Sequence, residues 1–140
     1  ITSINEWIKA FSNGQFNKLS MEFLLGQVFR VFAFMIGIDW NETILVGSLL
    51  GQKFVLNEFI AYKSLVDMKT AGLLSEKSIL ISTYALCGFA NFSSIAIQIG
   101  GIGSMAPSRQ KDISKLGLRA LLAASLATLL TGNIAGYIIA

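Results

Sequence analysis

The chain has 140 residues, of which 54% are hydrophobic and only 14% are charged, and its formal net charge is +3. Because a soluble domain of this size normally carries about 25% charged residues, the composition indicates a membrane protein. A single cysteine and the absence of histidine exclude a disulfide framework and the usual zinc sites. The small, scattered positive charge does not indicate a nucleic-acid partner. The chain begins at Ile1 without a visible signal peptide, and we interpret it as a fragment of a longer protein.

Residues 1–20 are interpreted as an amphipathic connecting segment. The apolar residues Ile4, Trp7, Ile8 and Phe11 follow helical spacing. A helix with this pattern can lie in the membrane interface, where tryptophan is a good anchor. An ordinary surface helix, or the end of an earlier membrane span, is an equally acceptable interpretation.

A transmembrane helix is predicted at residues 21–38, where Ser20 can cap the helix and Trp40 lies beyond its end. This segment is just long enough to cross the bilayer. Arg30 lies within it, and an arginine at the centre of an isolated span costs roughly 2.5 to 3.5 kcal/mol on insertion scales. A side chain that bends towards the interface, or that contacts a protein neighbour, explains Arg30 more simply than a role in transport.

Residues 41–66 contain two apolar stretches that meet at residues 51–53, Gly-Gln-Lys. Each half reaches about 15 to 20 Å as a helix, so neither half crosses the bilayer alone, and the pattern predicts a re-entrant helical hairpin. Glu58 lies in the second half among apolar residues, and an ionisable side chain at that depth is a functional candidate. The alternative is an interfacial helix pair in which Glu58 faces water.

An interrupted transmembrane helix is predicted at residues 77–107. From residue 79 to residue 108 there is no charged side chain, yet the middle of this stretch contains Gly88, Asn91, Ser93 and Ser94. Interrupted helices leave unpaired backbone groups near the midplane of the bilayer, and transporters build sites for hydrophilic solutes from them.

The final transmembrane helix is predicted at residues 108–140, because the stretch from 120 to 140 is uncharged and long enough to span. Small residues recur along it, so another helix can approach closely. They are Ala120, Ala124, Thr128, Gly132 and Gly136. The predicted fold class is therefore an all-α membrane protein.

Glu58, Asn91 and Ser94 form the candidate site. A carboxylate can accept hydrogen bonds from two vicinal hydroxyls, while an amide and a hydroxyl can both donate and accept. This set suits a neutral polyhydroxylated solute, whereas a cation site would need more carboxylates or carbonyls. No acid/base pair or activated nucleophile is visible, so the chain is not expected to be an enzyme.

Three motifs closely resemble the C-terminal half of the concentrative nucleoside transporters. They are NEFIAY at residues 57–62, ALCGFANFSSIAI at residues 85–97 and GGIGSMAP at residues 100–107. The resemblance implies a homotrimeric, multi-pass protein of the cell membrane that imports nucleosides together with sodium ions or protons. In this family a scaffold domain holds the trimer, and a transport domain with two re-entrant hairpins carries the substrate across by an elevator-like movement.

The resemblance also implies which residues bind the substrate. Family residues that hold the ribose fall on Glu58, Asn91 and Ser94, and Phe89 matches the residue that packs beside the nucleoside. The base-reading residues and the sodium ligands of the family belong to an N-terminal half, so the resemblance implies no cofactor or metal site in this chain. Base preference and the coupling cation stay open. The alternatives are a carrier for another small solute or ion, and a non-transporting membrane assembly subunit.

Overall fold

The computed structural model describes residues 6–7, 9–10 and 20–139, and this part of the chain is helical and contains no strand. The helices are α2 (Met21–Met35), α3 (Thr43–Val55), α4 (Glu58–Thr70), α5 (Glu76–Leu86), α6 (Phe92–Met105) and α7 (Gln110–Ile139), with the short 3-10 helix η1 (Pro107–Arg109) before α7. The prediction of an all-α fold is confirmed. The amphipathic segment predicted at residues 1–20 lies largely outside the described residues.

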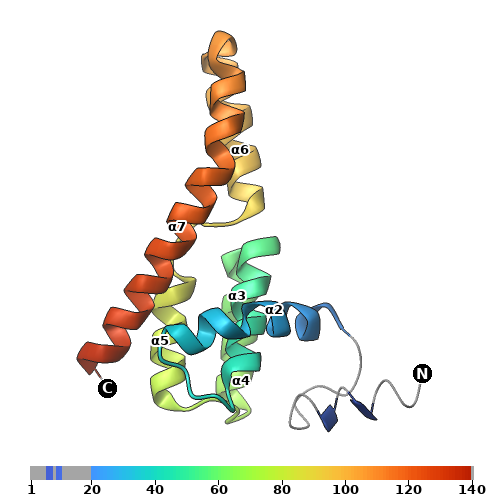
Figure 1. The fold of residues 1–140 in the computed structure, drawn as a ribbon, viewed down its shortest axis with the longest axis vertical. Coiled ribbons are helices and arrows are strands. Elements are labelled where there is room, and N and C mark those ends of the chain that lie inside the picture. Colours follow the sequence, from blue (N-terminus) through green and yellow to red (C-terminus); the bar gives the residue numbers. More distant parts are fainter. Residues whose placement is uncertain (1–5, 8, 11–19, 140) are drawn as a thin grey trace.

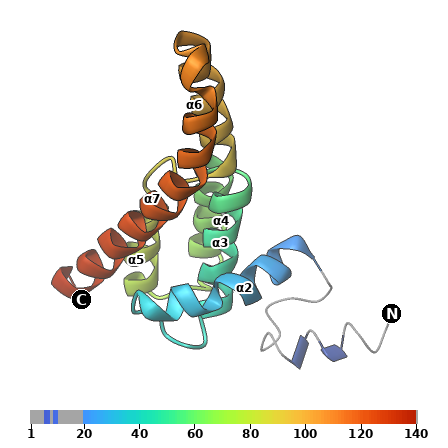
Figure 2. The ribbon, with the colours of Figure 1, turned by 45° about the horizontal axis from the view of Figure 1, so that its top comes forward.

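The helices are arranged around a hairpin and a broken helix. Helices α3 and α4 run in opposite directions and form the hairpin (Figure 1). Helices α5 and α6 then continue in one direction with a break between them, and α7 returns alongside both (Figure 2). Ser93 Oγ of α6 donates a hydrogen bond of 3.5 Å to Leu56 O at the bend of the hairpin. The closed end of the hairpin therefore lies against the break.

Helix α3 is the centre of the packing. Every residue from Thr43 to Lys53 is buried, so this part of the helix has no exposed face. On one side it contacts α2 through glycines: a Cβ atom at Gly47 would lie only 2.6 Å from Gly26 O. The first half of the hairpin is thus held between α2 and the rest of the molecule.

Helix α2 is shorter than the transmembrane helix that the sequence predicts at residues 21–38. Ser20 caps its start with a side-chain hydrogen bond, and the helix has 15 residues. Gly37 stops it: this residue has a φ of 96°, and Ile38 N donates to Ala33 O in a Schellman motif. A helix of this length reaches about 22 Å, less than the hydrocarbon thickness. The helix therefore ends three residues before the predicted boundary, and its passage across the bilayer stays a prediction.

Arg30 has protein partners at the junction of α2 and α3. Its Nε donates to Thr43 Oγ1 at 3.1 Å, and its guanidinium carbon lies 4.0 Å from the centroid of the Trp40 ring. Thr43 Oγ1 in turn donates to Trp40 O at 2.7 Å. Contact with a protein neighbour is therefore the explanation that the structure gives for this arginine.

The bend of the hairpin lies at Leu56 and Asn57, and its prediction at residues 51–53 is wrong. Residues 51–53 lie inside α3 and are buried. The helix ends later because Leu56 leaves the helical conformation and Asn57 caps α4 with its side chain. The glycine in the 51–53 run instead lets a side chain of α2 pack against α3. Helix α4 then continues to Thr70, beyond the predicted end of the hairpin.

The interruption predicted within residues 77–107 is present in the structure. Helix α5 ends at Leu86, α6 begins at Phe92, and the residues between them are not helical. Gly88 has a φ of 132° in this break. Ser94, which the sequence pattern places within the interruption, lies in the first turn of α6.

Helix α7 is continuous over 30 residues and packs against both halves of the broken helix. A Cβ atom at Gly132 would lie 2.9 Å from Ala85 Cβ and 3.0 Å from Ile81 O of α5. A Cβ atom at Gly136 would lie 2.6 Å from side-chain atoms of Ile81. Two of the small residues on this helix thus allow the close approach that their spacing predicts.

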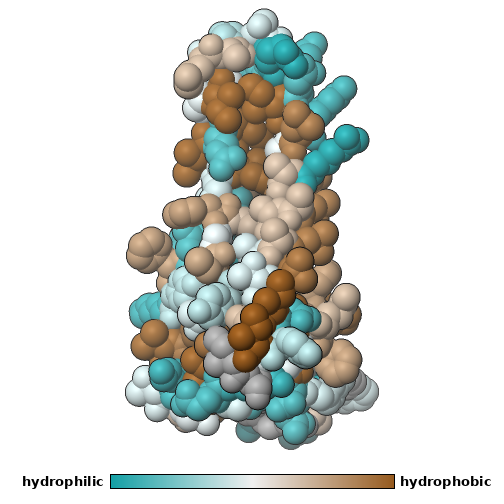
Figure 3. Space-filling model, turned by 90° about the vertical axis from the view of Figure 1, so that its left-hand side faces the viewer, coloured by the Kyte–Doolittle hydropathy of each residue, from teal (hydrophilic) through white to brown (hydrophobic). Residues whose placement is uncertain are grey.

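The outer side of α7 is apolar. Exposed aliphatic residues recur along it every four positions, and Figure 3 shows hydrophobic side chains along this side of the molecule, with hydrophilic side chains near the molecule's upper and lower ends. They are Leu118, Leu122, Leu126, Leu130, Ile134 and Ile138. Among the described residues, the helical stretch Pro107–Ile138 is the one whose length and hydropathy match a membrane span.

Candidate functional site

The candidate site lies where the hairpin closes against the break between α5 and α6. Two helices begin here: α4 follows the cap residue Asn57, and α6 follows the cap residue Asn91. Each asparagine accepts a backbone hydrogen bond with its side chain, at 3.0 Å and 2.7 Å respectively. Because helix N-termini carry positive partial charge, two of them side by side favour a carboxylate and oxygen-rich ligands.

Glu58, Asn91 and Ser94 form one hydrogen-bonded group. Asn91 Nδ2 donates to Glu58 Oε2 at 2.9 Å, and Asn91 Oδ1 accepts from both Ser94 N at 2.7 Å and Ser94 Oγ at 2.9 Å. Asn91 is only 1% exposed, whereas Glu58 and Ser94 are partly exposed. The structure thus brings together the three polar residues that the sequence analysis selected.

This group has acceptors left for a ligand. A carboxylate has about four acceptor positions, and the bond from Asn91 occupies one of them on Glu58. The Ser94 hydroxyl donates to Asn91, so its oxygen can still accept. This arrangement therefore suits a ligand whose hydroxyl groups donate hydrogen bonds.

Aromatic rings lie next to the polar group. Phe89 is in the break, two residues before Asn91, and is 73% exposed, so its side chain is free to contact a ligand. Phe54 at the end of α3 and Phe92 at the start of α6 pack edge to face, with ring centroids 4.9 Å apart. This pair, which the sequence analysis did not select, joins the hairpin to the second half of the broken helix.

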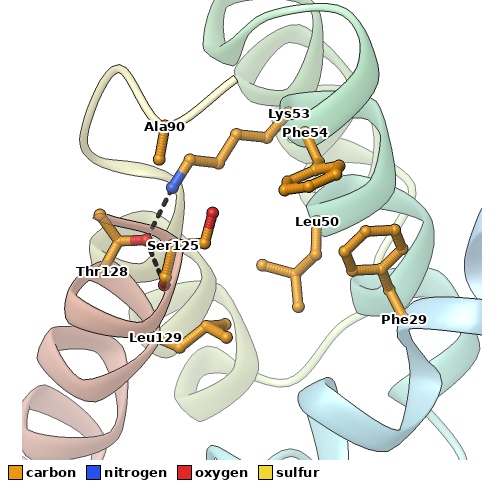
Figure 4. A pocket seen from close by; sticks show the side chains of 8 residues that line it. All are labelled: Phe29, Leu50, Lys53, Phe54, Ala90, Ser125, Thr128 and Leu129. Carbon is orange, nitrogen blue, oxygen red and sulfur yellow. Dashed lines mark hydrogen bonds between the residues drawn. The ribbon is translucent and has the colours of Figure 1, made fainter. Parts of the chain in front are cut away.

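Lys53 is the main residue that the sequence analysis missed. Its side chain leaves α3, and its ammonium donates to Thr128 Oγ1 at 2.8 Å (Figure 4). It also donates to Ala85 O at 2.9 Å. Lys53 is only 4% exposed. The signal was available, because a lysine within an apolar stretch at membrane depth is a functional candidate for the same reason as Glu58.

A small cavity of about 30 Å³ lies beside Lys53 (Figure 4). It is lined by Phe29, Leu50, Lys53, Phe54, Ala90, Ser125, Thr128 and Leu129. This volume holds about one or two water molecules and is far too small for an organic solute. Glu58, Asn91 and Ser94 do not line this cavity, and the exposed atoms of Glu58 and Ser94 are the ones that a ligand could contact. In the part of the chain that the structure describes, no cluster of three or more His, Cys, Asp or Glu side chains could hold a metal ion.

Comparison with known proteins identifies the family. Residues 1–136 match the family model described as "Na+ dependent nucleoside transporter C-terminus". The uncharacterized transporter YutK of Bacillus subtilis is 51% identical over 121 residues, which are 86% of this chain and 30% of YutK. Solute carrier family 28 member 3 of Mus musculus is 40% identical over 151 residues, which cover 99% of this chain and 21% of that protein.

The fold agrees with a solved structure. CNTnw in an inward-facing substrate-bound state matches with a TM-score of 0.81 and 41% sequence identity, over 97% of this chain and 34% of that chain. The chain spans 30% or less of the length of the two curated relatives named above. Since the family model matches nearly the whole sequence, this chain belongs to the concentrative nucleoside transporter family, a family of membrane proteins.

Proposed function

We propose that this chain supplies the ribose-binding half of a transporter that imports nucleosides across the cell membrane together with Na+ or H+. The base-reading residues and the site of the coupling cation belong, in this proposal, to an N-terminal half of the same transporter. The Na+ dependence named in the family description favours sodium as the coupling cation. The chemistry is solute recognition without a covalent step.

The observation that carries the proposal is the hydrogen-bonded group of Glu58, Asn91 and Ser94 at the break. A ribose presents two vicinal hydroxyls, and a carboxylate can accept from both. An analogue that lacks one hydroxyl leaves a polar group of the site unpaired, at a cost of about 1 to 3 kcal/mol. This cost corresponds to roughly a 5- to 150-fold loss of affinity, which is enough to select ribonucleosides.

The proposed arrangement in the membrane is multi-pass. Helix α7 crosses the bilayer, α5 and α6 together cross as one broken helix, and the α3–α4 hairpin enters and leaves from the same side. Helices α3 and α4 have 13 residues each and reach about 20 Å, so neither crosses alone. The bend is packed against the break, which is the condition for irregular backbone at membrane depth. Assembly as a homotrimer completes the proposal.

The test is uptake of labelled uridine by the full-length protein in transporter-deficient cells, beside its Glu58→Gln variant. The variant keeps the size of the side chain but removes the charge and half of its acceptors. Glu76→Gln is the matched control, because Glu76 is also the first residue of a helix that follows a capping side chain, and it is exposed. We expect saturable uptake of uridine by the parent and by Glu76→Gln. At equal membrane levels, we expect uridine uptake by Glu58→Gln to be at least 10-fold weaker.

Other results lead to other conclusions. If the parent carries no nucleoside, the substrate is a different solute, and competition by unlabelled candidate solutes identifies its class. If Glu58→Gln transports with the parental concentration dependence, this carboxylate does not hold the ribose, although the family assignment stands. If the parent carries no solute and Glu58 can be replaced without loss of function, the chain is a non-transporting assembly subunit.

A further inference from the structure

The break between α5 and α6 leaves backbone carbonyls at the end of α5 without partners within the helix. The last four carbonyls of a helix have no partner within the helix, and an unpaired carbonyl is costly away from water. Three of these carbonyls, on Thr83, Tyr84 and Ala85, accept hydrogen bonds in the structure. The donors to them show how this broken end is stabilised.

Two of the three donors come from the hairpin. Tyr84 O accepts locally, from the backbone of the first residue after the helix, at 3.2 Å. Thr83 O accepts from Tyr62 Oη of α4 at 2.7 Å, and Ala85 O accepts from Lys53 Nζ of α3 at 2.9 Å. Both helices of the hairpin therefore reach across to the same helix end.

Lys53 also carries the charge that this helix end favours. The C-terminal end of a helix has negative partial charge, so an ammonium beside it is stabilised. The second bond of Lys53, to Thr128 Oγ1 at 2.8 Å, connects α3 to α7. At 4% exposure the lysine is buried, and a buried ammonium requires oxygen partners of this kind.

The two charges of the hairpin are matched to the two ends of the break. Lys53, near the end of α3, lies at the C-terminal end of α5. Glu58, at the start of α4, accepts from Asn91 at the N-terminal end of α6. Positive charge thus meets the negative end of one half-helix, and negative charge meets the positive end of the other.

We propose that Lys53 is a tethered internal cation that fixes the end of α5 against the hairpin and α7, and so positions Asn91 and Glu58 for the substrate. Lys53 lies a few residues before Glu58 on the hairpin, and Ala85 lies a few residues before Asn91 at the break. Because the ammonium joins Lys53 to Ala85, it sets the distance between the hairpin and the break. It does not touch the ligand and is a positioning residue. This inference rests on the proposed function.

The experiment uses the full-length protein with Lys53→Met, which keeps an unbranched apolar side chain and removes the ammonium. Lys63→Met is the matched control, because Lys63 lies on the same hairpin and is exposed. The measured quantities are membrane level and the half-saturating concentrations for uridine and for 3'-deoxyuridine. We expect the value for uridine to rise at least 10-fold in Lys53→Met and the value for 3'-deoxyuridine to rise much less, so the preference for uridine falls towards one. Lys63→Met keeps the parental preference.

A second pair of variants keeps the test decisive if Lys53→Met does not reach the membrane. Thr128→Val removes the hydroxyl that accepts from Lys53 and preserves the shape, whereas Thr128→Ser keeps a hydroxyl. We expect Thr128→Val to lower the preference for uridine about 3-fold or more, and Thr128→Ser to keep it.

The outcomes separate the inference from the proposed function. If the parent transports uridine and Lys53→Met, or failing that Thr128→Val, keeps the parental preference, the inference is overturned and the proposed function stands. An equal loss for both nucleosides with a lower membrane level indicates a purely structural lysine and also overturns the inference. If the parent transports no nucleoside, the proposed function fails and the inference fails with it.

Discussion

Asn91 and Glu58 lie 33 residues apart in the chain, yet Asn91 Nδ2 donates to Glu58 Oε2 at 2.9 Å. Each residue stands at the start of a helix, since Asn91 caps α6 and Glu58 is the first residue of α4. Their contact connects the hairpin to the second half of the broken helix. A ribose bound here would bridge the same two elements, so substrate binding and the relative position of hairpin and break are linked.

Replacing Asn91 with serine separates the two roles of this residue. Serine is a good N-cap, so α6 keeps its cap, but the shorter side chain does not reach Glu58. We expect the free energy of unfolding of Asn91→Ser to lie within about 1 kcal/mol of the parental value. The half-saturating concentration for uridine should rise roughly 10-fold, because a hydrogen bond to a charged group contributes about 1.5 kcal/mol or more. Uptake assays and thermal unfolding of the purified full-length protein measure the two effects.

Asn57 provides the control for this variant. It caps α4 as Asn91 caps α6, and serine at this position also preserves the cap. Since Asn57→Ser leaves the contact between Asn91 and Glu58 in place, uridine uptake should stay at the parental value. Parental uridine affinity in Asn91→Ser would show that the amide donor is not part of the site.

Phe89 should matter for the ligand and not for the fold. It is largely exposed, so Phe89→Ala is expected to change the free energy of unfolding by no more than about 0.5 kcal/mol. Stacking of a base on an aromatic ring contributes about 1 to 3 kcal/mol, so the half-saturating concentration for uridine should rise about 5-fold or more. Tyr137→Ala, at another exposed aromatic residue near the end of α7, is the control. A large loss of stability in Phe89→Ala would instead make this ring a packing residue.

The candidate site could be predicted because its residues contrast with their surroundings. Glu58 and Asn91 are polar side chains within apolar stretches, and such residues are costly in a membrane protein, so they are candidates for a functional role. Lys53 stands out equally, but the glycine near it suggested a turn. Its partners, Ala85 O and Thr128 Oγ1, lie 32 and 75 residues away in the chain, so only the folded structure reveals them.

The fold could be predicted where a glycine or a capping residue has one structural role, and it could not be predicted where two roles fit the same residue. The sequence pattern around Gly51 predicts a bend, but this glycine provides space for close helix packing, and the bend lies a few residues later. Gly37 ends α2, although Ile38 continues the apolar run that suggested a longer helix. A glycine can provide conformational freedom or space, and a single sequence does not distinguish these uses.

Arg30 should stabilise the fold without contributing to transport. Arg30→Met keeps the apolar part of the side chain and removes both the hydrogen bond to Thr43 and the contact with the Trp40 ring. We expect a loss of about 1 to 2 kcal/mol in the free energy of unfolding. Because these contacts lie at the start of α3 and the site lies beyond its end, the half-saturating concentration for uridine should not change. Weaker uridine uptake at parental stability would give Arg30 a role in transport.

Gly88 should be required for the break itself. Its φ of 132° is one that L side chains rarely adopt, and a Cβ atom would lie 2.9 Å from Thr128 Cγ2 of α7. Gly88→Ala is therefore expected to destabilise the full-length protein by about 1 to 3 kcal/mol. It should also disturb the Thr128 hydroxyl that accepts from Lys53.

Gly100 gives the matched control for this substitution. It lies inside α6, and a Cβ atom there would meet no atom of this chain within 4 Å. Alanine at this position should stabilise the helix by up to about 1 kcal/mol, because glycine has the lower helix propensity. Thermal unfolding of both variants in the same detergent should therefore give shifts of opposite sign. If Gly88→Ala unfolds at or above the parental temperature, the backbone of the break tolerates a side chain, and α5 and α6 are not separated by the conformation of this glycine.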